Sequence, residues 1–145
     1  MSRAIVTLTV VSLIACGCNT TRVSHVDPDA RARIGYAATA QYPANPKAAT
    51  ASVLAAAVDH PRDKQIEVLN LSDNAVTTPT VWVNGAYLRQ LATLPPRGAV
   101  SIRYSELLQA GQTANDFERA AQTVTKVELQ SGGSLYSVLG PAVKR

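Results

Sequence analysis

The sequence predicts an all-β domain, a small β-sandwich with one or two short helical turns that follows a signal peptide and a tether. Short runs rich in β-branched and aromatic residues recur at roughly ten-residue spacing from residue 51 on. Gly, Pro, Asn and Asp separate these runs, which is typical of turns between strands. The core must be small, because only 5% of the residues are aromatic and alanine supplies much of the 46% hydrophobic content. We therefore expect one domain over residues 50–145.

Residues 1–15 have the pattern of a secretory signal. Arg3 supplies a positive charge, residues 4–15 are apolar apart from two threonines and a serine, and the run ends at a small residue. A helix of about twelve residues covers roughly 18 Å, well short of the ~30 Å hydrocarbon core of a bilayer. We expect a cleaved signal peptide rather than a membrane-spanning helix.

Residues 13–16, Leu-Ile-Ala-Cys, resemble the bacterial lipobox, in which a branched apolar residue and a small residue precede a lipidated cysteine. The resemblance implies cleavage before Cys16, a diacylglyceryl thioether on its sulfur and an acylated new N-terminus. It also implies a lipid-anchored protein of the bacterial cell envelope. Gly17 is not the aspartate that retains such proteins at the inner membrane, so it favours the outer membrane, facing the periplasm.

Cys18 is the only other cysteine and the second candidate for acylation. The alternative to lipidation is an ordinary signal with free thiols after the cleavage site. Two cysteines, with His25 and His60 as the only histidines, cannot form a closed four-ligand metal site, so we expect neither a metal nor a cofactor. A disulfide between Cys16 and Cys18 would close a strained loop.

Residues 16–49 are predicted to be the lipidated N-terminus and a flexible tether. The segment holds several prolines, and its apolar residues follow neither helical nor strand spacing for long. A flexible arm of about thirty residues would reach on the order of 30 Å. A short helix over residues 28–35 is the alternative for part of the arm, with Asp27 as its cap and Pro28 in its first turn.

The first strand of the domain is ambiguous from its own composition. Alanine favours a helix over residues 51–59, whereas the short length and the turn residues after it favour a strand. Residues 65–71 form a good strand, so we predict that the two segments pair as a hairpin. Asn84-Gly85 predicts a two-residue hairpin turn, because both central positions of that turn need positive φ.

About seven strands are predicted in all. They are residues 51–59, 65–71, 79–84, 86–91, 99–104, 124–130 and 135–139. Residues 105–108 look like one helical turn, and residues 115–118 have the spacing of a capping box before a brief helix.

Regular short strands with turn chemistry between them point to an immunoglobulin-like β-sandwich. Residues 69–102 resemble the strand-loop-strand arrangement of small extracellular immunoglobulin-like or fibronectin-like modules, and the whole chain is similar to small uncharacterised bacterial lipoproteins. The resemblance implies no functional residues.

Trp82, which lies between two valines, is the natural anchor of the core. With Tyr87 and Tyr136 it is also a candidate for a surface that stacks on a ligand such as peptidoglycan or another envelope glycan. We expect all three to be core or half-buried strand residues.

We expect no enzymatic activity. A catalytic nucleophile needs a neighbouring base, and His25 and His60 are the only histidines in the sequence. No Gly-x-Ser-x-Gly nucleophile elbow occurs. Asp59, Asp63 and Asp73 belong to predicted turns. The net charge of +4 is mild and spread along the chain, which argues against nucleic acid as a partner.

These observations predict a lipid-anchored, non-enzymatic envelope protein that presents a structural or protein-interaction module. The expected partners are the membrane, through the lipid anchor, and an envelope protein that the sequence does not identify. A domain that binds peptidoglycan or another glycan is the alternative.

Overall fold

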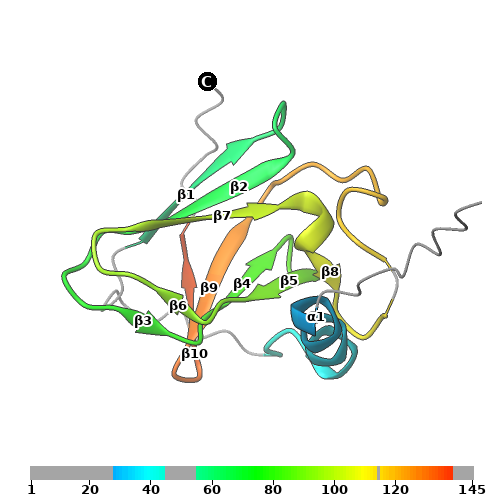
Figure 1. Cartoon of the computed structure of the whole chain (residues 1–145), viewed down its shortest axis with the longest axis horizontal. Helices are drawn as coiled ribbons and strands as arrows, with labels where there is room; N and C mark the ends of the chain where they lie inside the picture. Colours follow the sequence, from blue (N-terminus) through cyan, green and yellow to red (C-terminus); the bar gives the residue numbers. More distant parts are fainter. Residues whose placement is uncertain (1–27, 45–54, 114, 139–145) are drawn as a thin grey trace, which may run out of the picture.

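The computed structural model describes residues 28–44, 55–113 and 115–138. Cys16, Cys18 and the predicted signal lie outside these residues. Within the described part, the chain is mostly β, with ten strands, the helix α1 and one short 3-10 helix (Figure 1). The all-β prediction is confirmed at this level. No helix among the described residues is long and apolar enough to cross a membrane.

A three-stranded antiparallel sheet contains the first predicted hairpin. It consists of β1 (Ala55–His60), β2 (Gln65–Asn70) and β7 (Ala99–Arg103), in the order β1-β2-β7. Ala57 lies opposite Val68 and Asp59 opposite Ile66, which confirms that residues 55–60 form a strand rather than a helix. Alternate residues of β2 are buried, as a strand with one face on a core requires.

A five-stranded antiparallel sheet has the order β10-β9-β4-β5-β8. Its strands are β4 (Thr80–Val83), β5 (Tyr87–Gln90), β8 (Leu108–Gln109), β9 (Val127–Ser131) and β10 (Ser134–Ser137). Two further short strands, β3 (Val76–Thr77) and β6 (Thr93–Leu94), pair with each other.

The strand count is higher than the seven predicted. The additional strands β3, β6 and β8 have two residues each, too few to show a pattern in sequence. Residues 104–106 form the 3-10 helix η1 (Tyr104–Glu106), close to the predicted helical turn. The brief helix expected after residues 115–118 is absent: residues 117–121 form turns, and the Asp116 carboxylate accepts a hydrogen bond from the Arg119 N–H at 2.8 Å.

The Asn84-Gly85 turn has the predicted backbone but a longer loop. Both residues have positive φ, 54° and 68°, and the Ala86 N–H donates to the Val83 carbonyl at 3.2 Å. Val83 lies opposite Tyr87, so the loop holds three residues rather than two. The Asn84 carboxamide holds this loop against residues 123–126: its NH2 group donates to the Thr123 carbonyl, and its oxygen accepts from the Thr125 N–H.

The main core lies between the two larger sheets. Ile66, Val68 and Ile102 of the three-stranded sheet belong to one buried cluster with Val81 and Leu129 of the five-stranded sheet. All four residues of β4 are buried, because the five-stranded sheet is covered on its other face as well.

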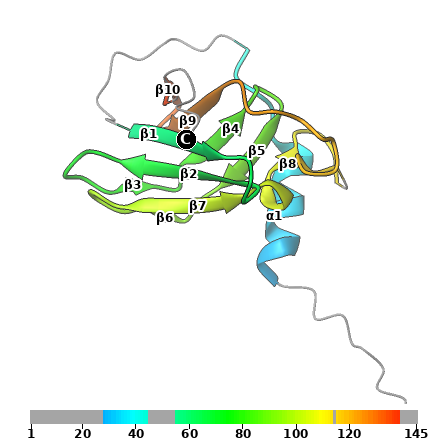
Figure 2. The same cartoon turned by 90° about the horizontal axis from the view of Figure 1, so that it is seen from above.

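Helix α1 (Pro28–Thr39) provides that second cover, and the predicted flexible arm is therefore wrong for residues 28–44. The alternative short helix is present and continues to Thr39. Ala37 is fully buried in a second cluster with Trp82, Leu88 and Leu135, and α1 lies beside β5 and β8 in both views (Figures 1 and 2). The helix forms here because it buries one side on the sheet, which compensates for its weak local signal.

Candidate functional site

Trp82 is the core anchor that the sequence predicted. Its side chain lies between α1 and the five-stranded sheet and is 1% exposed. The indole N–H donates to Gln130 Oε1 at 2.8 Å, and the ring of Tyr42 packs edge-on at a centroid distance of 5.3 Å. No face of the ring is open to a ligand.

Tyr87 and Tyr136 lie on the other face of the same sheet. Tyr87 is buried in the main core and packs edge-on against Phe117 at 5.2 Å. Tyr136 is half-buried against that core. The three aromatic candidates therefore do not form a common stacking surface, because Trp82 points toward α1 and both tyrosines point toward the opposite sheet.

The segment after α1 is fixed to β9 by a compact polar cluster. The Tyr42 hydroxyl donates to Glu128 Oε2 at 2.7 Å, and Lys126 Nζ lies 2.7 Å from Glu128 Oε1 and 3.0 Å from the Tyr42 oxygen. The hydrogen bond to Glu128 raises the pKa of Lys126. Glu128 is buried, so these two donors satisfy a charge that would otherwise be costly, and the cluster has a structural role.

A hollow of about 330 Å³ lies at one end of the sandwich, between the β1-β2 turn and residues 117–123. At its base the Tyr104 hydroxyl donates to the Asp59 carboxylate. Burial, together with this bond, raises the pKa of Tyr104 above its ordinary value, so the hydroxyl is a donor and not a base. His60 lies 3.6 Å from Glu67, both at positions on the outer face of the three-stranded sheet. In the described residues there is no group of three or more acidic, His or Cys side chains that could hold a metal ion.

The strongest candidate for a binding site is a cleft between α1 and β5, which we call the α1–β5 cleft. Its volume is about 200 Å³. Its lining consists of Asp29, Ala32, Arg33 and Tyr36 of α1, Leu88, Arg89 and Gln90 of β5, and Thr78, Leu91, Ala92, Glu106 and Leu108.

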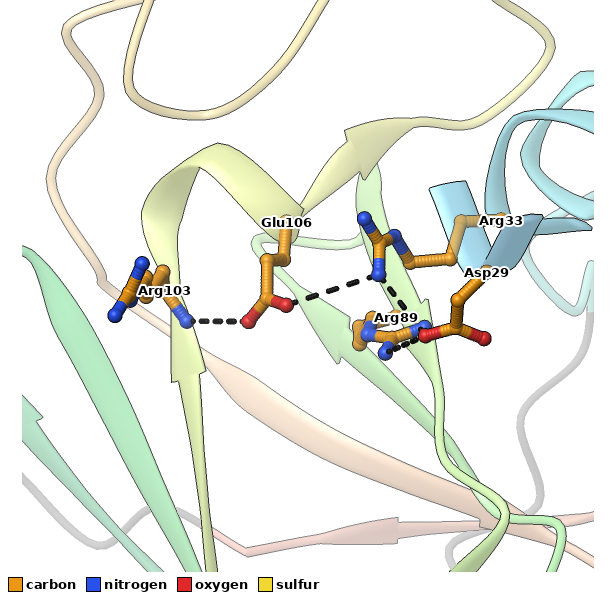
Figure 3. Close-up of polar contacts among 5 residues, drawn as sticks. All are labelled: Asp29, Arg33, Arg89, Arg103 and Glu106. Atoms are coloured by element: carbon orange, nitrogen blue, oxygen red, sulfur yellow. Dashed lines mark hydrogen bonds and ion pairs between the residues drawn. The ribbon is translucent and has the colours of Figure 1, made fainter. Parts of the chain in front are cut away.

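Two arginines meet one carboxylate in this cleft (Figure 3). Arg33 Nη1 lies 3.1 Å and Arg89 Nη2 lies 3.4 Å from the same atom, Asp29 Oδ2. Arg33 Nη1 is also 3.8 Å from Glu106 Oε1, while Glu106 Oε2 accepts the Arg103 N–H at 3.0 Å. Sequence reasoning missed this group, because it placed residues 16–49 in a tether. The four-residue spacing of Asp29 and Arg33 was the one local signal.

The chain matches no protein-family model, and no curated protein or solved structure is significantly similar to it.

Proposed function

We propose that the protein is a lipid-anchored lipoprotein of the bacterial cell envelope that presents an immunoglobulin-like β-sandwich as a structural or protein-interaction module. The observation that carries the proposal is the lipobox-like sequence at residues 13–16, at the end of a secretory signal pattern. Cys16 is the proposed lipidation site, and the module has no enzymatic role in this proposal.

Strand order supports the immunoglobulin-like assignment. The order β1-β2-β7 corresponds to strands A-B-E of an immunoglobulin sandwich, and β10-β9-β4-β5 corresponds to G-F-C-C′. All neighbouring strands in both sheets are antiparallel, as that fold requires. Helix α1 is an addition to this plan, and it covers the outer face of the G-F-C-C′ sheet.

The docked helix brings the module close to the proposed anchor. Residues 17–27 separate Cys16 from α1, in place of the longer tether predicted from sequence. A chain of this length spans at most about 40 Å when fully extended. We therefore infer that the start of α1 stays within about 40 Å of the membrane surface, and we expect its partners at or near that surface.

The test is the fate of the two cysteines. The full-length chain, the variant Cys16→Ser and the matched control Cys18→Ser are produced in a bacterial host, and the envelope fractions are analysed by mass spectrometry. We expect a lipidated N-terminal Cys16 in the wild type and in Cys18→Ser, and an unlipidated product from Cys16→Ser. An unmodified Cys16, or a mature N-terminus elsewhere, contradicts the proposal.

Crosslinking and pull-down from the intact envelope then address the partner. The interaction-module proposal expects envelope proteins in the captured material, whereas capture of peptidoglycan alone favours the glycan alternative. Of the three stacking candidates of that alternative, Trp82 and Tyr87 are buried, and Tyr136 is half-buried.

A further inference from the structure

In the α1–β5 cleft, two largely buried arginine side chains share one contact, the oxygen atom Asp29 Oδ2. The side chains of Arg33 and Arg89 are 19% and 16% exposed, and both contact Asp29 Oδ2. The Asp29 side chain is 64% exposed, because it stands in the first turn of α1 at the mouth of the cleft. An exposed carboxylate therefore lies between two largely buried arginine side chains.

The two arginines of the group are suited to pair with an incoming anion. Glu106 is fixed by the Arg103 N–H and lies beside Arg33, so it stays in the cleft when Asp29 moves. Arginine pairs with carboxylates through charge-assisted hydrogen bonds.

The remainder of the cleft is suited to a small apolar group. Its apolar lining comes from Ala32, Tyr36, Leu88, Leu91 and Leu108. The volume of about 200 Å³ exceeds the ~150 Å³ of a cavity that admits benzene. An apolar side chain next to the carboxylate fits this space.

The sheet edge at the cleft is suited to an extended main chain. Strand β8 pairs only with Tyr87 and Leu88 of β5, at Gln109 and Leu108. Gln90 continues β5 along the cleft beyond Leu88. Its main-chain N–H and C=O face away from β4, on the side where no strand of the described residues pairs with it. An extended peptide can add to an open edge of this kind through main-chain hydrogen bonds.

We propose that the α1–β5 cleft binds the C-terminal carboxylate of an extended peptide with an apolar last side chain. The ligand carboxylate replaces that of Asp29 between Arg33 and Arg89, and its last residues lie along the open edge of β5. The proposal concerns the folded domain and does not depend on lipidation of Cys16.

The test is calorimetric titration of the full-length chain in non-ionic detergent with acetyl-Ala-Ala-Val as the free acid. We expect the C-terminal amide of the same peptide to bind at least ~10-fold more weakly, since it lacks the charge. Arg33→Gln and Arg89→Gln should each weaken binding of the acid by ~10-fold or more. Asp29→Asn should tighten it several-fold, because the competing carboxylate is gone.

The opposite signs at Asp29 and the two arginines distinguish this site from a structural ion pair. Arg97→Gln and Asp73→Asn are the matched controls, because this exposed pair, 2.8 Å apart, lies in other loops; both should bind as the wild type does. Circular dichroism and thermal melts check that each variant is folded. If an arginine variant is unfolded, the affinity of Asp29→Asn for the acid and the affinity of the wild type for the amide still test the proposal.

Several results would overturn the proposal. They are equal binding of acid and amide, weaker or unchanged binding by Asp29→Asn, and no binding at millimolar peptide by either the wild type or Asp29→Asn. Titration with isovalerate, a carboxylate that has an apolar group but no peptide group, is the last control. If isovalerate binds as tightly as the peptide, the β5 edge has no role in binding and the peptide assignment is wrong.

Discussion

Replacing Trp82 tests whether α1 is an integral layer of the domain. The indole is 1% exposed and is enclosed by Ala37, Leu88 and Leu135, with Tyr42 packed edge-on. Truncating a buried tryptophan to alanine costs about 3–5 kcal/mol, a large share of the ~5–15 kcal/mol that stabilises a typical domain. Trp82→Phe should cost about 1–2 kcal/mol, because it keeps most of the ring but leaves Gln130 without its donor.

The assay is urea unfolding of the full-length chain in non-ionic detergent, followed by far-ultraviolet circular dichroism. Trp82 is the only tryptophan, so fluorescence would not compare the variants. The dependence of the unfolding free energy on urea scales with the surface that unfolding exposes. We therefore expect Trp82→Ala to lower this slope as well as the free energy, because α1 leaves the sheet in its folded state.

Leu71→Ala is the control, because Leu71 is the large hydrophobic side chain that stands exposed in the described residues, at 37%. It should change the free energy of unfolding by no more than about 0.5 kcal/mol. A Trp82→Ala variant within about 1 kcal/mol of the wild type would refute the reasoning, since a truncation in a packed layer costs several times that.

Two further predictions concern Asn84 and Tyr104. Asn84→Gly keeps the positive φ of 54° but loses the side-chain bonds to residues 123–126, so urea unfolding should show a loss of about 1–3 kcal/mol. Asn84→Ala should lose about 1 kcal/mol more, because alanine disfavours the left-handed region, and equal stability of the glycine variant and the wild type would show that the carboxamide contributes nothing. The raised pKa of Tyr104 means that the unfolded chain releases this proton near pH 10 while the folded chain keeps it. Stability is therefore fully present below pH 10 and falls as the pH rises above it, by up to about 1.4 kcal/mol per unit from this group. Unfolding at pH 9, 10 and 11 should show a shallower decline for Tyr104→Phe, and identical declines would count against the role of its buried hydroxyl.

Much of the sheet structure could be predicted from the sequence. Each of the seven predicted segments contains a strand, and the hairpin of β1 and β2 forms as its turn indicated. These features depend on neighbouring residues: alternation along a strand and the φ preferences of Asn84 and Gly85 are local properties. The two-residue strands were missed because only a partner elsewhere in the chain defines them.

The candidate site could not be predicted in the same way. Arg33 and Arg89 are far apart in the sequence, and each alone reads as a solvated charge. Asp29 contacts Arg89 across 60 positions, and only the docking of α1 on β5 brings these groups together.

The sequence by itself determined the lipobox-like Cys16 at the end of a signal pattern, the β class and the burial of Trp82, because each depends on residue type and local spacing. Only the tertiary structure decided where the domain begins. Residues 28–39 have a weak helical pattern of their own, and they become a helix because Trp82, Leu88 and Leu135 offer an apolar face for Ala37. That contact adds α1 to the domain and creates the cleft beside it, because packing between distant segments supplies the free energy that local propensity lacks.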